Sequence, residues 1–257
     1  MRGRLLAVAL LVGAGATFAL PAWGGGDARR VAAPNRITRL RVCGNDVVPF
    51  RGLQCARDQR GAPITAKEID CSVRVYVGAA RAVFAASVTY EGQVQYSFRE
   101  RLRRGWHREL IGVYVHATQM PGGRYACNVS LARTRASVAF RSGGAFAPVV
   151  GPAVCRTAHT KDDACTADEG GTAIPAGTRA LTCTGVFPRL KGARVEIDFV
   201  RFESDGTESV LHRAKDTLPY PIVEEWVSFA QAWTPGEYAC RYLVNGTIAA
   251  ERRFSVA

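Results

Sequence analysis

The chain has 257 residues, a formal net charge of +12 and a hydrophobic content of 47%. That hydrophobic content allows packed cores and excludes an intrinsically disordered chain. The length suits one large domain or two domains of roughly 100 residues each.

Residues 1–22 have the pattern of a secretory signal peptide. Two arginines precede an apolar run from Leu5 to Leu20, and small residues predict cleavage between Ala16 and Ala22. The alternative is an N-terminal membrane anchor, but the run contains two glycines and is short beside the roughly 20 apolar residues of a spanning helix. No later segment has the pattern of a transmembrane helix. We therefore expect export to the periplasm or the cell exterior.

The cysteines form one pattern that is written twice. Successive spacings of 12, 16 and 56 residues in the first half recur as 10, 18 and 57 in the second half, so the same frame returns after about 112 residues. An even number of cysteines fits disulfides in an oxidising compartment, and the absence of a C-x-x-C pair argues against a metal site. The eight are Cys43, Cys55, Cys71, Cys127, Cys155, Cys165, Cys183 and Cys240.

Alternation of apolar residues predicts β-strands around these cysteines. In the first half the alternating runs are 71–77 and 84–90, and a third strand returns through Val94, Tyr96 and Phe98. In the second half the runs are 181–187 and 195–199. Hairpin turns are expected at Glu91-Gly92, Asp205-Gly206 and Asn245-Gly246.

The fourth cysteine of each frame stands in a Pro-Gly turn followed by Tyr-x-Cys, at Tyr125 and again at Tyr238. Together with a cysteine 56 or 57 residues earlier, this phrase resembles the tyrosine corner and inter-sheet disulfide of the immunoglobulin fold. The resemblance implies an all-β chain of two tandem immunoglobulin-like antiparallel β-sandwich domains, at residues 36–142 and 149–257. A short linker at 142–148 would make them a fixed or hinged rod.

The resemblance also implies a cysteine pairing and a role for the two tyrosines. The hydroxyls of Tyr125 and Tyr238 would turn back to the backbone of the preceding corner. Phe84 and Phe199 occupy the strand where antibody domains have a tryptophan, which favours a divergent bacterial immunoglobulin-like module. The implied pairs are Cys71–Cys127 and Cys183–Cys240 between sheets, with Cys43–Cys55 and Cys155–Cys165 formed locally.

No catalytic motif is present, so an enzyme, a cofactor and a metal are not expected. Four acidic residues surround Cys165, and they could form either a calcium loop or a solvated surface loop. Their spacing matches no EF-hand and favours the surface loop. They are Asp162, Asp163, Asp168 and Glu169.

Charge separates the two halves. Residues 31–150 carry a net charge of +11, whereas residues 151–257 carry −2. The basic excess is densest in one segment, where a strand continuing from Phe98 would place three arginines on one face with a tryptophan beside them. The candidate binding residues of this segment are Arg99, Arg101, Arg103, Arg104, Trp106 and Arg108.

Three interpretations of this segment remain open. The arginines could bind an anionic glycan, a lipid headgroup or an acidic protein, because guanidinium groups suit carboxylates and phosphates. They could dock on the second domain near Glu224 and Glu225. They could also form a solvated edge that prevents strand pairing with neighbours. Nucleic acid is not expected as a partner of an exported protein.

The function predicted from these patterns is a secreted, non-enzymatic binding or adhesion module that recognises an anionic partner through the basic surface of the first domain. The alternative is a structural or assembly component of an envelope or extracellular complex, with contacts between subunits. A hydrolase with a site between the domains is a third hypothesis, for which the sequence offers no motif.

Overall fold

The computed structural model describes residues 34–44, 54–116 and 118–257. Within them the chain is all-β, with fourteen strands, one short 3-10 helix and antiparallel sheets. The predicted signal peptide lies outside the described residues. No helix in the described ranges is long and apolar enough to cross a membrane.

The N-terminal half forms one five-stranded sheet in the order β1-β2-β4-β5, with β3 paired to β2. Its hydrophobic residues alternate with polar ones, so one side of each strand enters the core. The strands are β1 (Arg36–Gly44), β2 (Glu68–Tyr90), β3 (Gln93–Tyr114), β4 (Gly123–Leu131) and β5 (Thr134–Ser142).

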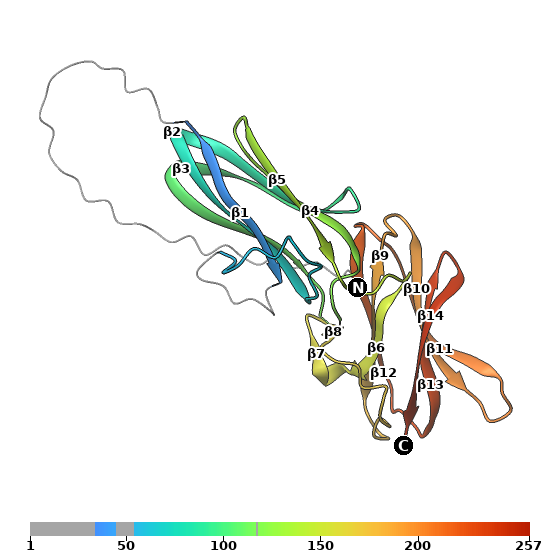
Figure 1. Ribbon diagram of the computed structural model, residues 1–257. Helices are drawn as coiled ribbons and strands as arrows, with labels where there is room; N and C mark the ends of the chain where they lie inside the picture. Colours follow the sequence, from blue (N-terminus) through green and yellow to red (C-terminus); the bar gives the residue numbers. More distant parts are fainter. Residues whose placement is uncertain (1–33, 45–53, 117) are drawn as a thin grey trace, which may run out of the picture.

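This sheet is folded over on itself into two layers (Figure 1). The first part of β2 pairs with β1, whereas its second part pairs with β4. The Cys71–Cys127 disulfide joins the first part of β2 to β4, so the two parts of β2 face each other across the core. The sequence predicted two separate strands at 71–77 and 84–90. The structure makes them one long strand, because β3 stays paired to β2 through the bend.

The C-terminal half has its strands in separate sheets, in the orders β11-β10-β13-β14 and β12-β9-β6. A two-stranded β7-β8 ribbon and the helix η1 (Thr157–His159) complete it. The strands are β6 (Val150–Arg156), β7 (Thr160–Lys161), β8 (Ala164–Cys165), β9 (Ala180–Pro188), β10 (Arg194–Phe202), β11 (Glu208–Thr217), β12 (Ile222–Ala230), β13 (Gly236–Val244) and β14 (Thr247–Val256).

The two halves repeat the same strand connections. β6 and β9 take the places of β1 and the first part of β2, while β13 and β14 take those of β4 and β5. Each half also has one isolated parallel bridge to its last strand, Ile64 to Ser142 and Ile174 to Val256. The duplication seen in the cysteine spacing is therefore a duplication of topology.

The cysteines form the four pairs that the resemblance implies: Cys43–Cys55, Cys71–Cys127, Cys155–Cys165 and Cys183–Cys240. The tyrosine hydroxyls also turn back as expected. Tyr125 Oη donates to the carbonyl oxygen of Pro121, and Tyr238 Oη donates to that of Thr234, each over 2.9 Å. The predicted turns at Glu91-Gly92 and Asn245-Gly246 have positive φ at both positions, as a type I′ turn requires.

The short disulfides Cys43–Cys55 and Cys155–Cys165 close two loops that share one hydrogen-bonding pattern. The backbone N–H of Cys55 donates to Ser72 Oγ, and that of Cys165 donates to Thr184 Oγ1, each over 3.0 Å. Three residues after each of these cysteines an aspartate, Asp58 or Asp168, accepts a hydrogen bond from the backbone of the first strand. Asp168 is thus held by the protein itself.

Two of the other acidic residues of the second loop have partners too. Glu169 binds Arg156 and His159, and Asp162 binds His116. Among the described residues no group of three or more histidine, cysteine, aspartate or glutamate side chains is arranged to hold a metal ion. Asp162, Asp168 and Glu169, which surround Cys165, therefore form contacts within the protein.

The two halves meet end to end (Figure 1). Val150, Val186 and Ile222 of the C-terminal half are buried within the hydrophobic cluster of the N-terminal half. Gln95 hydrogen-bonds the backbone of Ile222, and both the backbone N–H and the ring Nδ1 of His116 lie 2.8 Å from Glu224 Oε2. Polar and apolar contacts thus fix the junction together.

Candidate anion-binding face

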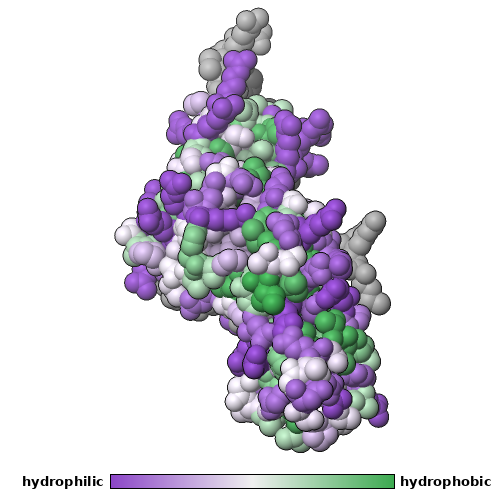
Figure 2. Space-filling model, turned by 90° about the vertical axis from the view of Figure 1, so that its right-hand side faces the viewer, coloured by the Kyte–Doolittle hydropathy of each residue, from purple (hydrophilic) through white to green (hydrophobic). Residues whose placement is uncertain are grey.

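All six candidate residues predicted from the sequence lie on β3 and are exposed. β3 pairs only with β2 in the described part of the chain, so its other edge carries no partner strand. Hydrophilic side chains project over much of the surface in Figure 2, and the hydrophobic areas are smaller and lie mainly in the lower half of that view.

The structure separates five of the six residues into two groups, and Arg104 lies between these groups, next to Gly105. Arg99, Arg101 and Arg103 share one face, as predicted, on the outside of the layer that contains β4 and β5. Gly105, with φ of +131°, lies where β3 passes over the bend of the sheet. Beyond it Trp106 and Arg108 lie on the outside of the opposite layer, where the first part of β2 separates them from β1. The expectation that Trp106 stands beside the three arginines is wrong, because the strand changes layers between them.

Trp106 belongs to a small aromatic cluster of its own. The guanidinium carbon of Arg74 lies 4.2 Å from the centre of its ring, and Tyr76 packs at 5.1 Å. Half of the Trp106 side chain remains exposed. A cation–π contact of this kind holds the indole in place against the sheet.

The predicted docking of the arginines on Glu224 and Glu225 is not found. Glu224 instead binds His116, and hydrogen bonding to this carboxylate raises the pKa of the imidazole. Burial raises the pKa of Glu225 to about 7. Glu224 therefore belongs to the junction between the halves, whereas the arginine segment runs along β3 away from it.

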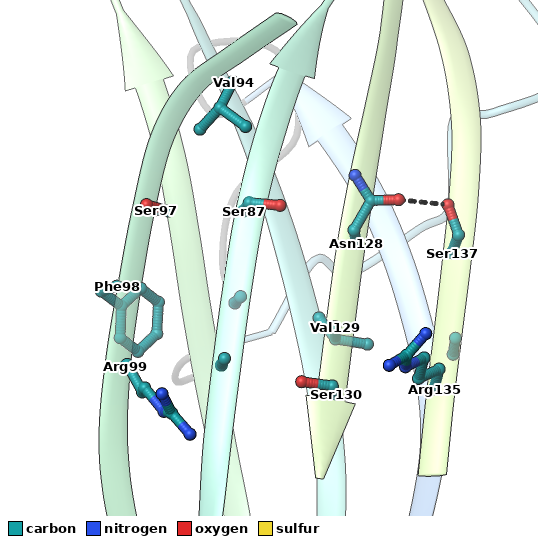
Figure 3. Close-up of a pocket in the computed structure, with 13 residues that line it drawn as sticks. Ser87, Val94, Ser97, Phe98, Arg99, Asn128, Val129, Ser130, Arg135 and Ser137 are labelled. Atoms are coloured by element: carbon teal, nitrogen blue, oxygen red, sulfur yellow. Dashed lines mark hydrogen bonds between the residues drawn. The ribbon is translucent and has the colours of Figure 1, made fainter. Parts of the chain in front are cut away.

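A hollow lies on the outer face of the sheet part that bears Arg99 (Figure 3). It has a volume of about 880 Å³ and spans all four strands of that layer. The strand registers align its side chains in two rows across the sheet. The first row reads Ser97, Ser87, Asn128 and Ser137, and the second reads Arg99, Ala85, Ser130 and Arg135.

The side chains of this hollow are small in the middle and cationic at both sides. Within the first row Ser137 Oγ donates a hydrogen bond of 2.8 Å to Asn128 Oδ1. Arg99 and Arg135 stand on the two outer strands, and their guanidinium groups turn inward over the sheet (Figure 3). Phe84 and Val88 fill the inner side of β2 with no exposed surface, so a closed core lies beneath the hollow.

The equivalent face of the C-terminal half is filled. The row that corresponds to the four small polar residues reads Arg213, Asp198, Arg241 and Glu251. Arg213 holds the buried Asp198 through two hydrogen bonds of 2.9 and 2.7 Å, and Arg241 Nε donates to Glu251 over 2.9 Å. Long side chains of alternating charge thus occupy the space that is open in the first half.

The arginines of the hollow lack such partners. Neither Arg99 nor Arg135 forms an ion pair within the described residues, and the same holds for Arg101 and Arg103. Since unpaired guanidinium groups are strong donors to carboxylate, sulfate and phosphate oxygens, this face can attract and orient an anion.

A buried carboxyl pair lies on the inner side of the same strand. Glu109 is 6% exposed, and burial together with the neighbouring Glu100 raises its pKa to about 8. At neutral pH Glu109 therefore retains its proton. It lies inside the sandwich, so it does not cancel the charge that the arginines present outside.

The sequence alone did not reveal the hollow. Its signal was visible as small residues at alternating positions, Ala85 and Ser87, Asn128 and Ser130, but their alignment depends on the register of four strands. Neither a family model nor a curated protein matches the chain.

Proposed function

We propose that this chain is an exported, non-enzymatic binding protein made of two tandem immunoglobulin-like domains, residues 36–142 and 149–257. It recognises an anionic partner in the periplasm or outside the cell. The partner binds to the hollow of the first domain, between Arg99 and Arg135.

The fold assignment is supported by the repeated sheets, inter-sheet disulfides and tyrosine hydroxyl bonds. Four disulfides are typical of an oxidising, exported environment. Fold alone leaves the function open, so the function rests on the site.

One observation carries the functional proposal. The same sheet face is neutralised by internal ion pairs in the second half and left open and cationic in the first. Internal ion pairs like those of the second half would be enough to keep such a face soluble. Keeping small residues between two unpaired arginines leaves room for a ligand.

The test is retention on an immobilised polyanion of the heparin type. The double variant Arg99→Ala, Arg135→Ala should elute at clearly lower salt than the unaltered protein, because two guanidinium contacts are lost. The matched control Arg179→Ala, Arg194→Ala removes the same charge from exposed positions of the second half. Equal elution of the two double variants would show that only net charge matters and would overturn the proposal.

The second candidate function is assembly into an envelope complex, and the open edge of β3 favours it. This strand is 22 residues long, and among the described residues it pairs on one side only. Its exposed arginines oppose pairing with a second copy of the same edge, because like charges would face each other. Cross-linking in the native envelope that recovered only monomers would exclude this role.

A further inference from the structure

We propose that the ligand of the hollow is a linear anionic glycan that lies across the strands and contacts both Arg99 and Arg135. The proposal rests on the anion-binding function above and names the chemical class of the partner. The other anionic partners, an acidic polypeptide and a lipid headgroup, become outcomes of the test.

The floor of the hollow offers side-chain hydroxyl and amide groups in a line. Ser97, Ser87, Asn128 and Ser137 stand in register across β3, β2, β4 and β5, with Ser130 in the next row. Hydroxyl groups both donate and accept hydrogen bonds, and an amide does the same. Sugar hydroxyls have the same dual character, so a chain of sugars could be bound along this line.

A peptide would find little to bind on this surface. Peptides are recognised on sheets mainly by main-chain hydrogen bonds at an open edge. In the hollow, the backbone groups of β2 and β4 are used on both sides by their neighbouring strands. Side chains are therefore the main source of polar contacts, which favours a ligand that carries many hydroxyl groups of its own.

The two arginines set the length of the ligand. Arg99 on β3 and Arg135 on β5 are separated by three strand spacings, or roughly 14 Å at about 4.8 Å each. A single phosphate headgroup is small beside this span. A glycan with carboxylate or sulfate groups on successive sugars can contact both, and each contact is a charge-assisted hydrogen bond.

Apolar surface completes the match. Val94 is half exposed at one end of the hollow, and Phe98, Ala85 and Ala136 contribute to its lining. Sugar rings present C–H surfaces as well as hydroxyls, so these side chains can pack against them. The volume of about 880 Å³ exceeds what one sugar needs and suits an oligosaccharide.

The first experiment compares ligands on the complete exported protein by titration calorimetry. The probes are a heparin-type hexasaccharide, the matching disaccharide, poly-glutamate of similar charge and vesicles containing phosphatidylglycerol. We expect the hexasaccharide to bind at least about tenfold more tightly than the disaccharide and poly-glutamate, since only it contacts both arginines and the hydroxyl row.

The ligand series separates the two proposals. Equal binding of poly-glutamate or vesicles that is lost with Arg99→Ala, Arg135→Ala would overturn the glycan and keep the anion-binding function. Hexasaccharide binding that is insensitive to that double variant would overturn both.

The second experiment fills the hollow without changing net charge. The variant Ser97→Arg, Ser87→Asp, Asn128→Arg, Ser137→Glu copies the self-paired row of the second half into the first. We expect hexasaccharide affinity to fall about tenfold or more. Undiminished affinity in a folded variant would place the ligand elsewhere and overturn the proposal. Ser87→Gln, a single larger side chain in the centre of the row, gives the same readout if the fourfold variant does not fold.

Discussion

Gln95 and Ile222 are joined by two hydrogen bonds across the junction between the halves. The side-chain amide of Gln95 donates to the carbonyl oxygen of Ile222 over 2.6 Å and accepts from its N–H over 2.8 Å. Gln95 thus satisfies the first backbone groups of β12 as a neighbouring strand would. Both residues are buried, so these bonds have no ready replacement by water.

Replacing Gln95 by Leu should therefore weaken the junction. The backbone groups of Ile222 would be left buried without partners, at a cost of about 1–3 kcal/mol. Urea unfolding should show a lower midpoint or two separate transitions in place of one. Gln93→Leu, at an exposed position of the same strand, is the control. Identical unfolding curves for the two variants would contradict this role.

The His116 imidazole should titrate above its usual range. Nδ1 lies 2.8 Å from Glu224 and Nε2 lies 3.2 Å from Asp162, so two carboxylates favour the charged ring. NMR titration should show a raised pKa that falls back toward about 6.5 in Glu224→Gln. Because the folded pKa is raised, this contact stabilises the fold below pH 6.5 and its contribution is lost as pH rises through the folded pKa.

Stability should decline from mildly acidic to mildly basic pH. Burial raises the pKa of Asp70 to about 8, and that of Glu109 also to about 8. Between the unfolded and folded pKa values folding takes up a proton at each site, so each rise in pH opposes folding. For Asp70 we expect a loss of about 2–4 kcal/mol between pH 5 and 8.

Urea denaturation across this pH range measures the effect. Asp70→Asn should flatten the pH dependence, because the amide cannot titrate. The opposite trend should appear in acid, where the lowered pKa values of Glu169 and Glu251 make their stabilisation disappear as those carboxylates become protonated. A wild-type profile that rises steadily from pH 5 to 8 would rule out protonated Asp70 and Glu109.

The two corner tyrosines should contribute to stability through their hydroxyls. Tyr125→Phe and Tyr238→Phe each remove one hydrogen bond to a backbone carbonyl and leave the ring in place. Each should cost about 1–2 kcal/mol in the free energy of unfolding. Tyr220→Phe, at an exposed position, should cost little. Thermal or urea unfolding gives the comparison, and unchanged stability of both corner variants would show that these bonds are replaced by water.

Trp106 and Arg108 should be dispensable for polyanion binding at the hollow. They lie on the outside of the opposite layer, so Trp106→Ala and Arg108→Ala should retain the affinity of the unaltered protein. Fluorescence anisotropy with a labelled hexasaccharide measures this against Arg99→Ala. A loss as large as that of Arg99→Ala would mean that the ligand reaches around the edge of β3.

The sequence predicted the disulfides, the corner tyrosines and a hairpin turn correctly, because their signals are local or covalent. The cysteine spacing, the Tyr-x-Cys phrase and the Asn245-Gly246 turn each act over a few residues or impose a covalent link. The paired loops that begin at Cys55 and Cys165 also have a local signal in the sequence, since an aspartate follows three residues after each cysteine.

The site was less predictable because it depends on how distant strands align. Alternation along β3 correctly grouped Arg99 with Arg101 and Arg103, but it could not show the change of layer near Gly105 that separates Trp106 from them. Arg135 lies on a different strand, and only the strand registers show that it stands in one row with Arg99. The site therefore depends on strand-pairing registers, which no local sequence pattern encodes.

The two long disulfides also limit how far the protein can extend under tension. The described part of the protein begins at the outer end of the first half, and the C-terminus lies at the far end of the second half (Figure 1). A pull between these ends cannot extend the chain inside the long disulfide loops, which span 56 and 57 residues. At about 3.4 Å per residue, each bridge prevents the extension of roughly 190 Å of enclosed chain. Under tension the oxidised protein can extend only outside these loops, and reducing both long bridges would add roughly 380 Å to the length that the chain can reach.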